Sequence, residues 1–433
     1  MVLQRPAHGL LEPHASPRWA ARTPVVLSGV ILFAVLVHLA FLSILPVRWR
    51  INQSADYFQF YEPVAHNLLA GKGFVTGDGK PASEFPPGFP LVLADSFAAA
   101  RAWGLSEELA LRLQIVFCVG VSAILVYLIA ERVFGVHTAV VAAVLWSTYP
   151  LQLWLTKQPD SGHIFNVFLL SAICILLNSD RGGFAFPRIF LVGIFIGIAS
   201  LVRPIGIALS AVFLCGLWIF KSGTPQKRCA ILAGLMVMGN VVAIAPWELW
   251  AHRVTSKWIP LSAGGRASIL DGITLGAWRS SQGLTLKIPI RVRSVIGEYV
   301  ANQRNLTTTA EVAKFTLNEA ARHPLAMAEL FAMKSARAWY ASDSQRFERI
   351  IAMVQAPYIL LFLCGLWYAR VQGGVKRAFA SFTLLFVIYF WGMTVLALSI
   401  VRYMLPAMAL IVMFPAHLLA NIYSLRRPNA CSP

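Results

Sequence analysis

Acidic residues are scarce in this sequence. The 433 residues include only 19 Asp and Glu against 37 Lys and Arg, and charged residues of both signs make up 13% of the chain. Hydrophobic residues make up 58%, and the mean hydropathy is +0.66, which excludes an ordinary soluble globular protein of this length. The net charge of +18 favours anionic partners. In a membrane protein these are membrane lipids or phosphate-bearing substrates, so we expect no nucleic acid partner.

Several common catalytic and binding motifs are also missing. The sequence contains no Walker A motif and no His-Glu-x-x-His pair, and no predicted strand precedes its glycine-rich turns at 71–73 and 77–79. The cysteines lie mostly within apolar runs and lack metal-ligand spacing, which favours buried thiols; they are Cys118, Cys174, Cys215, Cys229, Cys364 and Cys431. We therefore predict no cofactor and no compact metal site, without excluding a divalent metal.

Long apolar runs dominate what is present. A helix needs roughly 20 apolar residues to cross a bilayer, and the sequence predicts an all-α polytopic membrane protein with about ten transmembrane helices. The first is too long for a secretory signal and no small-residue cleavage site follows, so we expect it to be retained. The predicted spans are 25–46, 111–131, 138–156, 162–178, 188–202, 204–220, 229–247, 353–369, 378–400 and 403–423.

Positive charge in the short loops predicts the orientation. With the N-terminus inside, the short outer turns contain only Lys157, Arg203 and Arg402, and the other Lys and Arg of the tails and short loops are cytoplasmic. Both termini are then cytoplasmic, and two long loops, 47–110 and 248–352, lie outside. Because nearly every acid also lies outside, we expect any chemistry at the extracytoplasmic face.

This topology divides the chain into three parts. Residues 1–247 form an N-terminal transmembrane catalytic module that includes the first outer loop, 248–352 form an extracytoplasmic cap, and 353–433 form the C-terminal transmembrane helices. In the first outer loop, Pro87–Trp103 is apolar but short, which predicts a re-entrant or interfacial helix. In the cap, Trp258–Gly265 is typical of a loop, and 310–349 shows helical spacing. An alternative is that the cap lies on the lipid headgroups.

Charged side chains occur at the outer ends of several predicted spans. The acids are Asp56, Glu84 and Asp160, and the cations are Lys157, Arg203, Arg266 and Arg402. Transfer of a group from a phosphate carrier needs a carboxylate to take the acceptor's proton and cations to hold the phosphate. Structural roles are the alternatives. In these, Asp56 and Asp160 cap helices, Glu84 is a solvated loop acid, and Arg203 and Arg402 reach the lipid headgroups.

Seven short motifs, in order along the chain, carry a resemblance to a known family. They are Asp56-Tyr57 to Tyr61 with Gly71–Phe74; Pro86-Pro87-Gly88-Phe89-Pro90-Leu91; Arg132-Val133-Phe134-Gly135; Pro159-Asp160; Leu201-Val202-Arg203-Pro204-Ile205-Gly206; Pro246-Trp247 with Ile259–Gly265; and Arg402-Tyr403-Met404-Leu405-Pro406. The sequence thereby resembles the GT-C class of polytopic glycosyltransferases. More narrowly, it is similar to the family of bacterial aminoarabinose transferases of lipid A and protein O-mannosyltransferases.

The resemblance implies roles for individual residues. Asp56 becomes the catalytic base or the acid that orients the acceptor. Asp160 either lies on the acceptor side of the site or supports a residue that contacts substrate. Tyr57 and Tyr61 contact substrate. Glu84 lies where the aminoarabinose enzymes have an acid followed by Lys-Pro, but Phe85 replaces that lysine here. The phosphate-binding role then passes to one or more other cations, which are Lys157, Arg203, Arg266 and Arg402.

The resemblance also implies a reaction. The protein would be an inverting transferase at the outer face of the cytoplasmic membrane, moving a sugar from a polyprenyl-phosphate donor to a lipid, glycan or protein acceptor. A lipid or sugar transporter or flippase is the main alternative, but such proteins place ionisable residues near the bilayer midplane within repeated halves, and this sequence does neither. A non-catalytic assembly subunit is a third possibility, against which the presence of Asp56 argues.

Overall fold

The computed structural model describes residues 23–52, 54–179, 185–279, 286–342 and 344–425. The positively charged tails used to predict the orientation, 1–22 and 426–433, lie outside these ranges. The described residues are almost entirely helical, and their only β-structure is an isolated bridge between Val75 and Pro81. The predicted all-α polytopic fold is confirmed.

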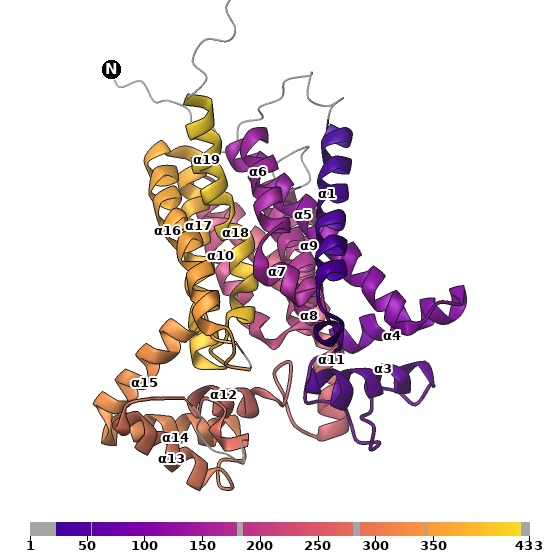
Figure 1. Ribbon diagram of the computed structural model, residues 1–433, viewed down its shortest axis with the longest axis vertical. Helices are drawn as coiled ribbons and strands as arrows, with labels where there is room; N and C mark the ends of the chain where they lie inside the picture. The colour runs from indigo at the N-terminus through magenta and orange to yellow at the C-terminus, as the bar shows by residue number, and fades with distance from the viewer. Residues whose placement is uncertain (1–22, 53, 180–184, 280–285, 343, 426–433) are drawn as a thin grey trace, which may run out of the picture.

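An upright bundle of helices forms the larger part of the molecule (Figure 1). Its first described helix begins, and its last ends, at the end opposite to the cap helices (Figure 1). The bundle helices are α1 (Thr23–Ile44), α5 (Glu107–Phe134), α6 (Val136–Ser147), α7 (Pro150–Leu155), α8 (Ser161–Leu177), α9 (Ala185–Val202), α10 (Leu209–Phe220), α11 (Gln226–Thr255), α16 (Glu348–Gln372), α17 (Gly374–Leu396), α18 (Leu405–Ile411) and α19 (Met413–Leu425).

Two smaller groups of helices lie at the other end of the bundle (Figure 1). The first outer loop contains α2 (Val47–Arg50), the π-helical turn η1 (Tyr57–Tyr61), α3 (Glu62–Leu69) and α4 (Gly88–Trp103). The cap contains α12 (Gly265–Ile273), η4 (Ala277–Arg279), α13 (Ile290–Asn302), α14 (Thr309–Arg322) and α15 (Pro324–Arg337). Two short turns, η3 (Pro204–Gly206) and η5 (Val401–Met404), complete this end of the bundle.

Among the described residues, seven helical segments are long and apolar enough to cross a membrane: Pro24–Ile44, Glu107–Phe134, Ala185–Val202, Gln226–Thr255, Glu348–Gln372, Gly374–Leu396 and Val401–Ile422. Three shorter apolar helices, α6, α8 and α10, lie where the sequence predicts further spans. The total of ten therefore stays a prediction. The helix predicted over Pro87–Trp103 exists as α4, which lies beside α5 and projects from the bundle (Figure 1).

Helix ends differ from the predicted span ends where the chain leaves the apolar region. Helix α11 runs to Thr255 rather than stopping at 247, and α16 begins at Glu348 rather than 353. Hydropathy marks only where the apolar stretch ends, whereas the backbone hydrogen bonds of a helix continue into polar sequence. The cap also contains α12 and α13, which the spacing of apolar residues did not predict.

Glycines allow α9 and α11 to cross closely. A Cβ on Gly193 would lie 2.0 Å from the carbonyl oxygen of Met236, and a Cβ on Gly239 would lie 2.2 Å from that of Phe190. Larger residues would push the two backbones apart, because small residues are what permit such close packing between membrane helices. This contact fixes α9, whose C-terminal end leads directly into Arg203.

The bundle and the cap have separate hydrophobic cores. In the bundle, fully buried aromatic side chains such as Trp146, Phe165 and Phe386 belong to one large cluster. In the cap, Leu270, Tyr299 and other side chains of α12 to α15 form a second cluster. The cap is therefore a folded unit with its own core, and it meets the bundle near the end of α17.

Candidate active site

Asp56 lies at the start of η1 and does not cap it. Its backbone is helical (φ −60°, ψ −34°), and its side chain makes no capping hydrogen bond. Instead, the backbone N–H of Tyr57 donates to the hydroxyl oxygen of Ser54 at 3.3 Å. Within the described part of the chain, the half-exposed Asp56 carboxylate has no hydrogen bond or ion pair. It is thus available to a substrate.

Asp160 is held in the opposite way. It is buried, and it caps α8 by accepting a hydrogen bond from the backbone N–H of Gly162 at 2.6 Å. The buried guanidinium of Arg203 donates to the same Asp160 oxygen at 2.9 Å and to the hydroxyl of Ser161 at 2.8 Å. Asp160 therefore caps α8, as in the structural alternative, and it also forms an ion pair with Arg203.

The charges around Asp160 keep its carboxyl ionised. Burial alone would raise its pKa, because a low-dielectric interior disfavours the charged form. The positive charges of Arg203 and Arg402 and the hydrogen bond from Gly162 outweigh burial, and they hold the pKa of Asp160 below its ordinary value. An acid in this state is a poor proton acceptor, so Asp160 orients Arg203 rather than acting as a base.

Tyr403 joins the two arginines that the sequence places at the outer ends of different spans. The guanidinium carbon of Arg203 lies 5.6 Å from the centre of the Tyr403 ring, and that of Arg402 lies 5.3 Å from it. Because η5 follows the end of α17, this segment brings Arg402 and Tyr403 to the end of α9. Two cations that are nearly 200 residues apart in sequence thus flank one aromatic ring.

Tyr61 connects the arginines to Asp56. Burial raises the pKa of the Tyr61 hydroxyl above its ordinary range, and the negative charge of Asp56 raises it further, whereas Arg203 and Arg402 lower it. Tyr61 therefore lies within electrostatic range of Asp56, Arg203 and Arg402. We call Asp56, Tyr61, Arg203, Arg402 and Tyr403 the arginine–tyrosine cluster: both arginines contact the Tyr403 ring, and the charges of Asp56 and the arginines act on the Tyr61 hydroxyl. Asp160 is joined to it through the ion pair with Arg203.

Glu84 lies beside this cluster, on the segment that leads into α4. It is exposed, and its backbone carbonyl accepts from the N–H of Gly264 at 2.9 Å, which ties the first outer loop to the start of the cap. The neighbouring Phe85 ring packs against Tyr61, with ring centres 5.1 Å apart. Phe85, at the position where the aminoarabinose enzymes have a lysine, thus packs against an aromatic ring and carries no charge.

Gly88 explains why the proline-rich motif and the Arg203 motif lie together. A Cβ on Gly88 would lie 2.7 Å from the carbonyl oxygen of Leu201 and 2.8 Å from a side-chain carbon of Val202. Only glycine permits this approach of the α4 start to the end of α9 without a shift. The start of α4 and the end of α9 therefore meet within a few residues of Arg203.

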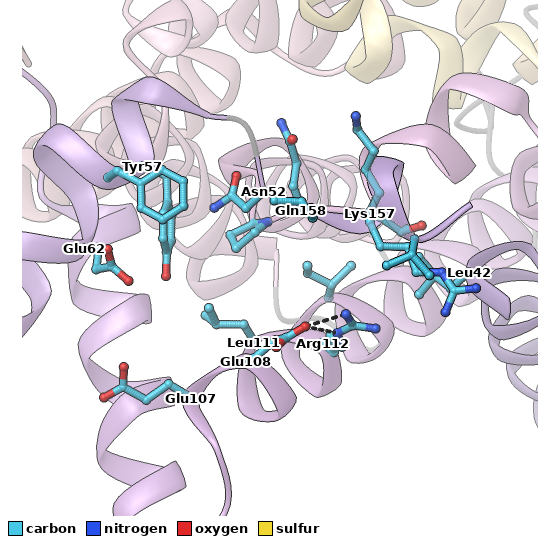
Figure 2. Close-up of a pocket in the computed structure, with 17 residues that line it drawn as sticks. Leu42, Asn52, Tyr57, Glu62, Glu107, Glu108, Leu111, Arg112, Lys157 and Gln158 are labelled. Carbon is cyan, nitrogen blue, oxygen red and sulfur yellow. Dashed lines mark hydrogen bonds and ion pairs between the residues drawn. The ribbon is translucent and has the colours of Figure 1, made fainter. Parts of the chain in front are cut away.

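A cavity of about 630 Å³ lies beside η1, between the C-terminal end of α1, the N-terminal end of α5 and the turn before α8. Tyr57 and Lys157 line it, but Asp56 and the arginines of the cluster do not. Glu62 and Glu107 lie at one end, Lys157 lies at the other, and an ion pair between Glu108 and Arg112 lies between them (Figure 2).

Lys157 and Arg266 both lie apart from the arginine–tyrosine cluster. The ammonium of Lys157 is 4.3 Å from the centre of the Trp154 ring, and burial lowers its pKa. The guanidinium of Arg266 donates to the carbonyl oxygens of Leu306 and, at 3.0 Å, of Gln303, beyond the end of α13. Of the four predicted phosphate-binding cations, the structure brings only Arg203 and Arg402 together.

Sequence reasoning overlooked two residues at the site. Tyr403 directly follows the candidate Arg402 in sequence, and this position could have indicated that it belongs to the site. His163, in the first turn of α8, is buried and lies three residues after Asp160. No pattern in the sequence distinguishes it from an ordinary histidine of an apolar helix. Among the residues described, no group of three or more His, Cys, Asp or Glu side chains is placed to hold a metal ion.

Comparison with known proteins shows the class of fold. Neither a protein-family model nor a curated protein sequence matches the chain. Among solved structures, this chain is similar to the oligosaccharyltransferase AglB from Archaeoglobus fulgidus, in complex with an inhibitory peptide and a dolichol-phosphate. The match covers 93% of this chain and 51% of AglB, with a TM-score of 0.59 and 14% identity. The chain has the GT-C fold.

Two further solved structures are similar to this chain. The same A. fulgidus enzyme, tethered by a disulfide to an acceptor peptide with an NVT sequon, matches with a TM-score of 0.56 and 13% identity over 95% of this chain and 51% of its own. This chain thus spans about half the length of the oligosaccharyltransferases. ArnT from Cupriavidus metallidurans, bound to undecaprenyl phosphate, matches 95% of this chain and 80% of its own at 13% identity. Its TM-score of 0.42 is too low to establish a shared fold.

Proposed function

We propose that the protein transfers a sugar from a polyprenyl-phosphate donor to an acceptor hydroxyl at the extracytoplasmic face of the cytoplasmic membrane. One observation carries the proposal: Arg203 and Arg402, from distant segments, both contact the Tyr403 ring at one end of a GT-C bundle, and the charge of Asp56 acts on the neighbouring Tyr61 hydroxyl together with theirs. This arrangement combines two cations with a carboxylate that has no hydrogen-bond or ion-pair partner among the described residues. The reaction requires both kinds of group.

The proposed step is a single displacement with inversion. The acceptor oxygen attacks the anomeric carbon of the sugar while the bond from that carbon to the phosphate oxygen breaks. Asp56 takes the proton of the acceptor, and the electron pair of the broken bond stays on the phosphate. Arg402 and Arg203 stabilise the charge that develops there, because cations already in position need no reorganisation during the reaction.

The surrounding residues have supporting roles in this proposal. Asp160 holds Arg203 through the 2.9 Å ion pair, and Tyr61 and Tyr403 shape the space between the base and the cations. The cavity beside Tyr57 and Lys157 is proposed to receive part of one substrate, since its lining combines apolar side chains of α1 and α5 with a cation. The polyprenyl tail gives a physical reason for a site embedded at the membrane edge.

A release assay tests the proposal. Purified protein in lipid nanodiscs is mixed with a panel of polyprenyl-phosphate sugars and a membrane extract as acceptor, and free polyprenyl phosphate is measured. We expect release with one sugar and none with Asp56→Asn. Asp95→Asn is the matched control, because Asp95 is an exposed acid of α4 in the same outer loop. Lipid movement across the bilayer, with no release from any donor, would instead establish a flippase.

A further inference from the structure

Lys334 is a buried lysine that the proposed reaction does not use. It lies in the last turn of α15, in the cap, and it is 0% exposed. Its ammonium donates to the carbonyl oxygen of Ala397 at 3.0 Å. Burial lowers the pKa of Lys334 to about 7. A lysine that loses its hydration in this way is costly to retain, so its position calls for a physical reason.

The partner of Lys334 is the end of a membrane helix. Ala397 follows α17, and the carbonyl groups at a helix C-terminus lack partners within the helix and carry partial negative charge. Gly272 of α12 packs directly on this point: a Cβ there would lie 1.6 Å from the Ala397 oxygen and 2.8 Å from the Lys334 nitrogen. Two cap helices therefore enclose the end of α17.

Further contacts tie the same segment to the cap. The backbone N–H of Val401 donates to the carbonyl oxygen of Ala341 at 2.9 Å, just beyond α15. One to two turns before the end of α17, the indole N–H of Trp391 donates to the carbonyl oxygen of Ser335 at 2.9 Å. The segment 397–401 is thus held at both of its ends by the cap, and the next residue is Arg402.

We propose that Lys334 is a positioning residue, which fixes segment 397–401 and so places Arg402 and Tyr403 in the arginine–tyrosine cluster. The cap then contributes to transfer through the backbone of η5, without touching substrate. The proposal rests on the proposed function, because the consequence of placing Arg402 is a faster reaction. It also has a structural consequence, the order of 397–404, that does not depend on any reaction.

Lys334→Met removes the ammonium but keeps the length and apolar volume of the side chain. We expect the variant to melt at or above the wild-type temperature, since it no longer buries an amine. We also expect turnover to be about 10- to 100-fold slower, because a displacement of about 1 Å at a reacting centre has this effect. Hydrogen exchange followed by mass spectrometry should show faster exchange in peptides covering 397–404. Lys314→Met is the matched control: it removes an exposed lysine from α14 of the same cap and should leave turnover and exchange near wild type.

A double-mutant cycle tests whether Lys334 acts through Arg402. In an Arg402→Met background, Lys334→Met should cause no further loss of turnover, because residues that act through one another are not additive. Losses that multiply, or wild-type turnover and exchange in Lys334→Met, would overturn the proposal. Val401→Pro is a second variant: it removes the N–H that donates to Ala341 without touching Lys334, and it should reproduce both effects. An absence of transfer by the wild-type protein counts against the proposed function alone, since the exchange measurement needs no substrate.

Discussion

The first outer loop and the turn before α8 each bring an acid to the same end of the bundle, and they hold it differently. The Asp56 carboxylate, at the start of η1, is half-exposed and makes no capping hydrogen bond. The Asp160 carboxylate is buried, accepts from Gly162 and pairs with Arg203. The contrast shows that nearness to a site does not define a role. An acid whose lone pairs are occupied organises its surroundings, whereas an unoccupied one can accept a proton.

The largest expected effect comes from the unoccupied acid. Asp56→Asn keeps the shape of the side chain but removes its ability to take a proton, so turnover should fall by about 100-fold or more. The melting temperature should stay within error of the wild type, because no hydrogen bond of Asp56 is lost. The measurement is release of polyprenyl phosphate alongside thermal unfolding in nanodiscs. Near-wild-type release would remove Asp56 from the reaction.

The paired acid should affect folding first. Asp160→Asn leaves the buried Arg203 without a counter-charge, and breaking a buried pair from one side costs about 3–5 kcal/mol. The expected result is a lower melting temperature, with loss of turnover following from loss of structure. The double variant Asp160→Asn with Arg203→Met removes both charges, and it should recover most of the stability. If the single variant melts like the wild type, the ion pair is not structural.

The same contrast predicts a dependence on pH. Because the pKa of Asp160 is lowered in the folded protein, its stabilising contribution is fully present above the unfolded value of roughly 3.9 and is lost as the pH falls through the folded value. Melting temperatures measured from about pH 6 down to about pH 3 should therefore fall more steeply for the wild type than for the double variant that lacks both charges. Parallel curves would contradict the shift.

The smallest effect concerns the residue that caps η1 in place of Asp56. Ser54→Ala removes the acceptor for the Tyr57 N–H, and loss of such a cap typically costs about 1 kcal/mol. We expect a small drop in melting temperature and a loss of turnover of no more than about tenfold. Ser54→Asp restores an acceptor and should restore both. An effect as large as that of Asp56→Asn would mean that Ser54 itself contacts substrate.

The sequence by itself determined the class of the protein and the order of its parts. Apolar runs and loop composition predict helices at the observed places, including α4, because hydropathy depends on each segment alone. The seven motifs also indicated Asp56, Arg203 and Arg402. The local sequence pattern left open whether Asp56 and Asp160 cap helices. The hydrogen bonds of the folded structure show that Asp160 does and Asp56 does not.

Only the tertiary structure decided which charges meet. Arg203 finds Asp160 and Tyr403, whereas Arg266, an equal candidate by sequence, is engaged by two backbone carbonyl groups of the cap. Lys334 gave no signal, since a lysine in an amphipathic cap helix is ordinarily exposed, yet it reaches the end of α17. The physical reason is that Coulomb and hydrogen-bond energies depend on distances of a few ångströms, and helix packing sets these distances between segments that are remote in the chain.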